Sequence, residues 1–141
     1  MTRGTMTRSE REEFLAGVHV GVLAIDEPGR APLAVPIWYR YEGGEVFAHV
    51  QDGSVKAVLL RAAGRATLVV QTETPPYKYV SVEGPVRLDA GPHDEVAMAT
   101  RYLGPELGKW YAESTAGVEG VMVLRLVPEH WRTYDFAKLF E

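Results

Sequence analysis

Lys56 is the first residue whose position suggests binding chemistry. The stretch "HVQDGSVKAVLLR" ends a predicted strand, turns at Asp52-Gly53 and continues as a helix with Lys56 in its first turn. A helix N-terminus presents unpaired N–H groups and the positive end of the helix dipole, and both favour an anion such as phosphate. Ser54 and Lys56 are therefore candidates for a phosphate clamp. The local residues leave a second interpretation open, in which Ser54 only caps the helix and Lys56 is solvated.

A second candidate is the predicted strand "VPIWYRY", which contains a proline. Pro36 has no N–H to donate to a sheet, so this strand forms an edge, a bulge or a platform for a ligand. A flat aromatic ring packed along the strand would meet free backbone groups of Ile37 and Trp38. The alternative is an edge-strand proline with Trp38 in the core.

Other aromatic and titratable residues give weaker signals. Six aromatic residues are candidates for a pocket wall, although such side chains also serve the core or a dimer interface: Tyr77, Tyr79, Trp110, Tyr111, Trp131 and Tyr134. The histidines lack the clustered spacing of ligands, which predicts no metal site: His19, His49, His93 and His130. The sequence also lacks a nucleophile elbow, a P-loop and a dinucleotide fingerprint, which argues against hydrolases and classical Rossmann enzymes.

The composition limits the class of protein. The chain has 141 residues, no cysteine and a formal net charge of −4 at pH 7. The lack of cysteine removes disulfides and thiolate chemistry and predicts a cytoplasmic protein. The N-terminus lacks a signal peptide's apolar run, and no stretch approaches the ~20 apolar residues of a membrane span, so we expect no membrane partner. The acidic balance removes the general electrostatic attraction to nucleic acid, which we do not expect as a partner either.

The elements that must position these residues begin after a polar N-terminal stretch. Residues 1–7 are predicted to be a disordered tail, and residues 8–141 a single domain. Ser9 and Glu12 form a capping-box pattern, which predicts a short helix through about Ala16. Alternating patterns then predict a three-stranded antiparallel meander, with strands over residues 18–25, 31–41 and 45–50.

The remainder of the chain continues the β pattern around helical segments. Gly64 is predicted to end a helix, Gly84-Pro85 to mark a bend or bulge in a strand, and Gly104-Pro105 to separate two helices. Six or seven antiparallel strands in hairpin order, with a few short helices, predict a mainly β barrel. The segments in chain order are a helix over 54–64, strands over 65–73 and 77–89, helices over 92–103 and 106–113, and strands over 120–129 and 130–136.

The order of these segments resembles the pyridoxamine 5′-phosphate oxidase-like split β-barrel family, in particular its flavin- and deazaflavin-dependent oxidoreductases. The resemblance covers about Thr7 to Phe140. It implies a six- to seven-stranded antiparallel split β-barrel that binds its cofactor at the interface of a homodimer. It rests on the order and spacing of five stretches: "VPIWYRYEGGEVFAHV", "DGSVKAVLLR", "RATLVV", "YKYVSVEGPVRL" and "VPEHWRTYDFAK".

The resemblance also implies which residues contact a cofactor. A phosphate is implied at the strand end and helix start, and a flavin-like ring at the proline-containing strand. The implied phosphate-binding residues are His49, Val50, Ser54 and Lys56. The implied ring-contacting residues are Pro36, Ile37, Trp38 and Tyr79, with Tyr134 from the other subunit. No catalytic side chain is identified.

Two stretches bear on which cofactor is implied. Val55 stands where the family's FMN oxidases usually carry the arginine of a Ser-Arg-Lys turn, and the ending "WRTYDFAK" is similar to the deazaflavin branch. The resemblance therefore implies coenzyme F420 ahead of FMN. The implied function is a reductase that transfers a hydride between F420 and an unsaturated small-molecule substrate, with a proton from solvent or a nearby tyrosine. The alternatives are an FMN-dependent oxidase or flavin reductase and a non-catalytic protein that binds F420, FMN or haem, with His49 or His19 as the haem ligand.

Overall fold

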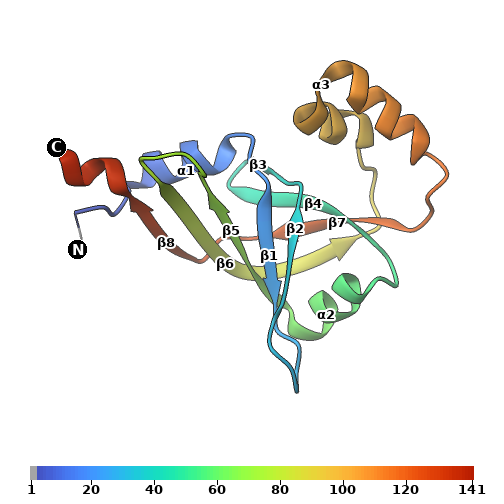
Figure 1. Ribbon diagram of the computed structural model, residues 1–141. Coiled ribbons are helices and arrows are strands. Elements are labelled where there is room, and N and C mark those ends of the chain that lie inside the picture. The colour runs from blue at the N-terminus through green and yellow to red at the C-terminus, as the bar shows by residue number, and fades with distance from the viewer. Residues whose placement is uncertain (1–2) are drawn as a thin grey trace.

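A strongly curled antiparallel sheet contains the eight strands found among residues 3–141, the part of the chain that the computed structural model describes (Figure 1). Its hydrogen-bonded order is β2-β1-β5-β6-β7-β4-β3, with β8 paired to β6. This sheet confirms the predicted mainly β, antiparallel split barrel. The strands are β1 (Gly21–Ile25), β2 (Leu33–Ile37), β3 (Arg40–Glu42), β4 (Glu45–Gln51), β5 (Arg65–Gln71), β6 (Lys78–Asp89), β7 (Val121–Leu126) and β8 (His130–Asp135).

The concave side of the sheet holds the hydrophobic core. Alternate residues of β4, β5 and β6 are buried, as expected for strands with one face toward the core. Tyr39 is the largest fully buried side chain, and its hydroxyl donates a 2.6 Å hydrogen bond to the carbonyl oxygen of Leu15. This bond ties the first helix to the sheet.

The segment 31–41 differs from its prediction, because it forms two strands instead of one. β2 and β3 lie at opposite ends of the sheet order, so the predicted three-stranded meander is wrong. The chain leaves β2 after Ile37, and the backbone of Tyr39 pairs with a side chain: its N–H donates to the Tyr102 hydroxyl at 2.9 Å, and that hydroxyl lies 2.8 Å from its carbonyl oxygen. The side chain of Tyr102, a helix residue, thus bonds the backbone groups that a neighbouring strand would otherwise pair where the chain crosses from β2 to β3.

The bend predicted at Gly84-Pro85 coincides with a change of partner along β6. Residues 78–83 of β6 pair with β8, residues 86–89 pair with β7, and the register with β5 runs through Gly84 without a bulge. The connection between β7 and β8 crosses at this point, and a Cβ on Gly84 would lie 1.7 Å from the carbonyl oxygen of Val127. Only glycine allows so close an approach between two backbones.

The first helix, α1 (Arg8–Ala16), begins one residue before the predicted cap. Its capping box consists of Thr7 and Glu10 instead of Ser9 and Glu12. Residues 3–7 also differ from the predicted disordered tail: Met6 is buried in the core, and its N–H donates to the Thr133 hydroxyl on β8 at 3.0 Å. Residues 1–2 of the predicted tail lie outside the described residues.

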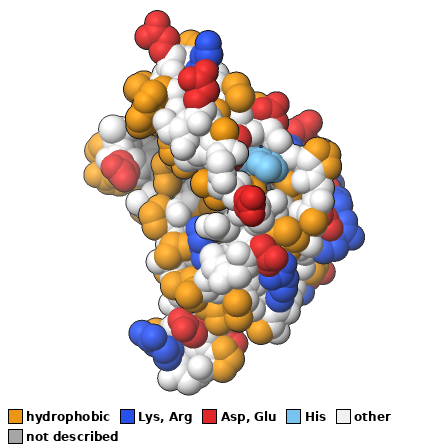
Figure 2. Space-filling model, turned by 90° about the vertical axis from the view of Figure 1, so that its right-hand side faces the viewer, with side chains coloured by type: hydrophobic (Ala, Val, Ile, Leu, Met, Phe, Trp, Pro, Cys, Tyr) orange, Lys and Arg blue, Asp and Glu red, His pale blue; other side chains and the backbone are white. Residues whose placement is uncertain are grey.

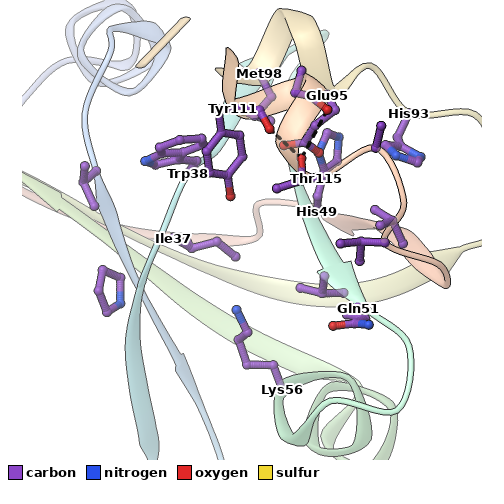
Figure 3. A pocket seen from close by; sticks show the side chains of 17 residues that line it. Ile37, Trp38, His49, Gln51, Lys56, His93, Glu95, Met98, Tyr111 and Thr115 are labelled. Atoms are coloured by element: carbon purple, nitrogen blue, oxygen red, sulfur yellow. Dashed lines mark hydrogen bonds and ion pairs between the residues drawn. The ribbon is translucent and has the colours of Figure 1, made fainter. Parts of the chain in front are cut away.

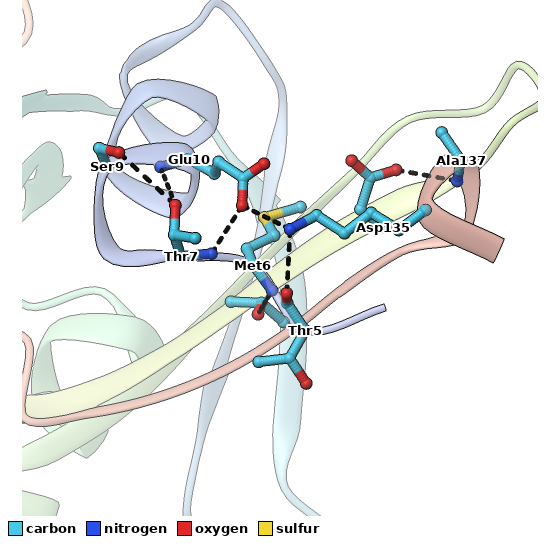
Figure 4. Close-up of polar contacts among 9 residues, drawn as sticks. Thr5, Met6, Thr7, Ser9, Glu10, Asp135 and Ala137 are labelled. Atoms are coloured by element: carbon cyan, nitrogen blue, oxygen red, sulfur yellow. Dashed lines mark hydrogen bonds and ion pairs between the residues drawn. The ribbon is translucent and has the colours of Figure 1, made fainter. Parts of the chain in front are cut away.

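Glu10 connects α1 to the C-terminal 3₁₀ helix, η1 (Phe136–Phe140) (Figure 4). One carboxylate oxygen of Glu10 accepts from Nζ of Lys138 at 2.6 Å and from the backbone N–H of Thr7 at 2.7 Å. These bonds, with that to Lys138 first, lower the pKa of Glu10 from 4.5 to about 2. Both chain ends are thereby held beside β8.

We expect Glu10→Gln to reduce the acid sensitivity of the fold. A lowered carboxyl pKa stabilises the folded state above pH 4.5, and this contribution is lost as the pH falls toward about 2. The urea midpoint of the wild type should therefore fall more steeply over this range than that of the variant. Glu13→Gln, which alters an exposed carboxylate of the same helix, is the matched control. Equal slopes for wild type and Glu10→Gln would contradict the prediction.

Two further helices flank the sheet. α2 (Val55–Ala63) ends at Gly64, whose φ of 69° is left-handed, as its predicted role requires. α3 (Glu95–Ser114) contains the predicted break, where Gly104 leaves helical geometry and Pro105 restarts the helix. Figure 1 shows α3 beyond one end of the sheet and α2 below β4. Among residues 3–141, no helix is both long and apolar enough to cross a membrane.

A candidate cofactor pocket between α2 and α3

A cavity of about 480 Å³ opens between α2 and α3, with β2 and β4 at its sides (Figure 3). This volume falls within the range of pockets that hold small molecules. Six of the nine residues predicted to contact a cofactor line it: Pro36, Ile37, Trp38, His49, Val50 and Lys56. Segments far apart in the sequence thus meet at one cavity, and the contact of these residues with a cofactor stays a prediction.

Lys56 extends from the first turn of α2 into the cavity (Figure 3). Among residues 3–141, no hydrogen bond or ion pair engages its ammonium group, and no other lysine or arginine lines the cavity. Ser54 is the N-cap, and its hydroxyl accepts from the N–H of Ala57 at 3.2 Å. Ser54 therefore caps the helix and does not line the cavity, whereas Lys56 presents a free cation to it.

β2 supplies the opposite wall. It is an end strand of the sheet order, which explains how Pro36 is accommodated without a broken ladder. Trp38 follows β2 and is half-buried; its ring stacks on Tyr102 at 5.0 Å between centroids and meets Tyr111 at 5.2 Å. Trp38 is thus a wall residue held by α3, which differs from the alternative of a core tryptophan.

Tyr102 fixes α3 over the cavity. Its hydroxyl lies 2.7 Å from the carbonyl oxygen of His19 and also engages both backbone groups of Tyr39. Arg101 adds guanidinium bonds of 3.1 and 2.8 Å to the carbonyl oxygens of Ala16 and Gly17. The N-terminal half of α3 is therefore attached to both the end of α1 and the crossover after β2.

We expect Tyr102→Phe to destabilise this attachment. The variant keeps the ring stacked on Trp38 but leaves the N–H of Tyr39 without its partner, and an unsatisfied buried donor costs about 1–2 kcal/mol. Urea denaturation should show this loss, and amide exchange should quicken at Tyr39. The control is Tyr77→Phe, which removes the hydroxyl of an exposed tyrosine. Unchanged exchange at Tyr39 would disprove the role given to the Tyr102 hydroxyl.

Tyr79 and Tyr134 lie elsewhere. They are paired across β6 and β8, and neither lines the cavity. The Tyr134 ring contacts Phe136 at 4.5 Å between centroids and packs over Gly4. Within one chain the structure therefore does not bring either tyrosine to the other predicted residues, and the approach of Tyr134 to a second subunit stays a prediction.

A histidine–carboxylate pair occupies the cavity wall near α3. Nδ1 of His49 lies 3.0 Å from Oε2 of Glu95, and the ring of His93 meets that of His49 edge-on at 5.1 Å. Burial lowers the pKa of His49 below 6.5, and the Glu95 carboxylate opposes that effect. Within residues 3–141, no group of three or more His, Asp or Glu side chains is arranged to hold a metal ion.

Most of the cavity wall that α3 contributes could not be predicted from the sequence. Helical periodicity predicted the helix, but it did not indicate which face lies over the cavity. Tyr111 alone among the six aromatic candidates lines the cavity; Trp110, its neighbour, is 63% exposed. The lining residues from α3 and the segment after it are Glu95, Met98, Tyr111, Ala112, Thr115, Ala116 and Val118.

The curled antiparallel sheet, with a cavity between a capped helix and an end strand, defines a split-barrel protein. The chain belongs to the pyridoxamine 5′-phosphate oxidase family, whose sequence pattern matches residues 7–134. Among curated proteins, none matches this sequence.

Solved structures show the same fold. A conserved hypothetical protein from Mycobacterium tuberculosis is 24% identical with a TM-score of 0.81, over 100% of this chain and 92% of that one. An F420 reductase is 18% identical with a TM-score of 0.67, over 86% and 94% of the two chains. An FAD-binding protein from Mesorhizobium loti is 21% identical with a TM-score of 0.65, over 92% and 94%. At these identities the likeness shows the fold alone.

Proposed function

We propose that this protein is an oxidoreductase that binds coenzyme F420 in the cavity between α2 and α3 and reduces an unsaturated small molecule. The free ammonium group of Lys56, directed into a cavity of about 480 Å³, is the observation that carries this proposal. Burying a cation without a partner is unfavourable, so an anionic ligand fits the site. The family membership and the structural likeness to an F420 reductase support the same conclusion.

The charge of the cavity argues against FMN, the alternative to F420. The phosphate monoester of FMN carries a charge near −2 at neutral pH. Lys56 is the one lysine or arginine lining the cavity among residues 3–141, and Val55 beside it is apolar. One ammonium group leaves part of the charge of that monoester without a partner.

The wall residues fit a planar ring. Pro36, Ile37 and Trp38 form one side of the cavity, and Tyr111 lies beside Trp38 (Figure 3). The bound deazaflavin would supply hydride transfer, while the protein orients the ring and excludes water from it. Trp38 is suited to orientation because stacking on Tyr102 restricts its ring.

We also propose that the cavity is completed by a second copy of the chain. Figure 2 shows hydrophobic side chains spread over the face that carries α3 and α2. Val55 and Val58 of α2 are 63% and 56% exposed, although their helical spacing is that of a buried face; Ala57 and Leu60 are buried instead. Apolar residues of this kind are typical of an interface. Light scattering after size-exclusion chromatography would measure the mass, and a monomer at micromolar concentration would contradict this part of the proposal.

The test of the function is a titration of cofactor-free protein with F420 and, separately, with FMN, followed by fluorescence. We expect saturable micromolar binding of F420 and weaker binding of FMN. Protein loaded with reduced F420 should then reoxidise this cofactor when an enone such as 2-cyclohexen-1-one is added as a hydride-accepting probe. Tighter binding of FMN would favour the oxidase alternative, and binding of neither would refute a cofactor-dependent enzyme.

A further inference from the structure

The wall that contains His49 separates two cavities. A second cavity, of about 560 Å³, lies on the other side of this wall, and three residues line both: His49, His93 and Met98. The second cavity is polar, with Arg40 and Arg101 among its lining residues. A titratable imidazole thus stands between the proposed cofactor pocket and a polar space.

Glu95 determines which nitrogen of His49 can exchange a proton. An ionised carboxylate only accepts hydrogen bonds, so at 3.0 Å Nδ1 must donate and carry the hydrogen in the neutral ring. Nε2 is then the position that gains and loses a proton. The same arrangement fixes the orientation of the imidazole, as a carboxylate partner does for histidines that act in catalysis.

We propose that His49 exchanges the proton that accompanies hydride transfer in the main cavity, and that Glu95 is its positioning residue. This inference rests on the proposed function and assigns its proton donor, for which the sequence indicated only solvent or a tyrosine. Tyr111 is the tyrosine that lines the cavity, but His49 alone both lines it and borders the second cavity with a bonded carboxylate.

The proton balance follows from the chemistry of a polarised C=C bond. A hydride supplied by the reduced cofactor forms a C–H bond at the electrophilic carbon, and the π electron pair moves to the neighbouring carbon. That carbon takes the proton from Nε2 of the imidazolium, so an N–H bond breaks and a second C–H bond forms. The substrate thus gains a hydrogen and two electrons from the hydride and one proton from His49. Neutral His49 then regains a proton from solvent through the second cavity.

Charged neighbours from several elements set the proton affinity of His49. Burial and the positive charge of Arg40 lower its pKa, and Glu95 raises it. Only the imidazolium form can donate this proton, so the rate of reduction should fall as the pH rises through the lowered pKa of His49. The titratable and charged groups around the two cavities are Glu95, Asp94 and Arg101 of α3 and its cap, His93 before it, Arg40 and Glu42 of β3, and Lys56 of α2.

The first test needs no cofactor. Histidine labelled with ¹⁵N reports the tautomer and pKa of each ring by NMR, and His49→Gln identifies the His49 signals. We expect hydrogen on Nδ1 in the neutral ring and a lower pKa in Glu95→Gln, because the variant removes the charge that stabilises the imidazolium. Hydrogen on Nε2, or an unchanged pKa in Glu95→Gln, would overturn the assignment of Glu95.

The second test uses protein loaded with reduced F420 and mixed with 2-cyclohexen-1-one in a single turnover. Compared at saturating F420, His49→Gln is expected to slow reoxidation by about 10²-fold, the usual contribution of a general acid. Glu95→Gln should shift the pH profile to lower pH. His130→Gln, an exposed histidine on β8, should behave as the wild type. An unchanged rate in F420-saturated His49→Gln would refute this inference alone, whereas failure of F420 to bind the wild type would refute the proposed function and this inference together.

Discussion

Gly84→Ala is expected to destabilise the protein by about 3 kcal/mol or more, the range of severe single substitutions. The added Cβ would lie 1.7 Å from the carbonyl oxygen of Val127 and 2.8 Å from its carbonyl carbon. Backbone atoms cannot rotate away as a side chain does, so β6 and the β7–β8 connection must separate. Two hydrogen bonds at this crossing would be strained, Val127 N–H to the Pro85 carbonyl at 3.0 Å and Glu129 N–H to the Glu83 carbonyl at 2.8 Å.

Urea denaturation of Gly84→Ala against wild type measures this effect. Gly91→Ala is the matched control, because a Cβ at Gly91 meets no atom within 4 Å and its φ is not left-handed. We expect the control to change the unfolding free energy by less than about 0.5 kcal/mol, as most surface substitutions do. A loss at Gly84 no larger than that at Gly91 would show that the two backbones are not held together in solution.

Local sequence patterns predicted most elements correctly, since alternation and caps act over a few residues. Ser54 and Gly64 bound α2 as predicted, and Gly104-Pro105 breaks α3. The strand pairing was less accessible because it depends on distant partners. Nothing near Tyr39 in the sequence indicates that its backbone pairs with Tyr102, which lies 63 residues away and causes the break between β2 and β3.

Site residues with a signal in their own helix or strand could be predicted from the sequence. Site residues that depend on contact between two elements could not. Lys56 and the strand around Pro36 have local signals, a helix N-terminus and a proline in a β pattern. Glu95 has none, because an acidic residue in the first turn of a helix is explained by the helix dipole alone. Glu95 contacts His49 only because the folded chain brings the start of α3 next to β4. Tyr79 and Tyr134 were predicted from the family resemblance, and within one chain neither of them lines the cavity.

Lys56→Ala is expected to weaken F420 binding by about 1.5–3 kcal/mol, the contribution of a hydrogen bond to a charged group. This corresponds to roughly a 10- to 150-fold increase in Kd. The loss should be specific to the phosphate, because Lys56 is half-buried, is the one lysine or arginine lining the cavity and has no hydrogen-bond or ion-pair partner among residues 3–141. Fluorescence titration at low and high salt measures it, and the difference between wild type and variant should shrink as salt rises.

A double-mutant cycle separates this role from a general disturbance of the cavity. Its second change is made in the ligand: F420 is replaced by the deazaflavin with its ribityl chain but no phosphate. If Lys56 binds the phosphate, Lys56→Ala should leave the affinity for the shorter ligand unchanged, so that the whole effect appears as coupling. Lys109→Ala removes an exposed lysine of α3 that does not line the cavity, and it should alter neither affinity. Equal losses for both ligands would place the role of Lys56 in the shape of the cavity, because a residue that binds phosphate cannot affect a ligand that lacks one.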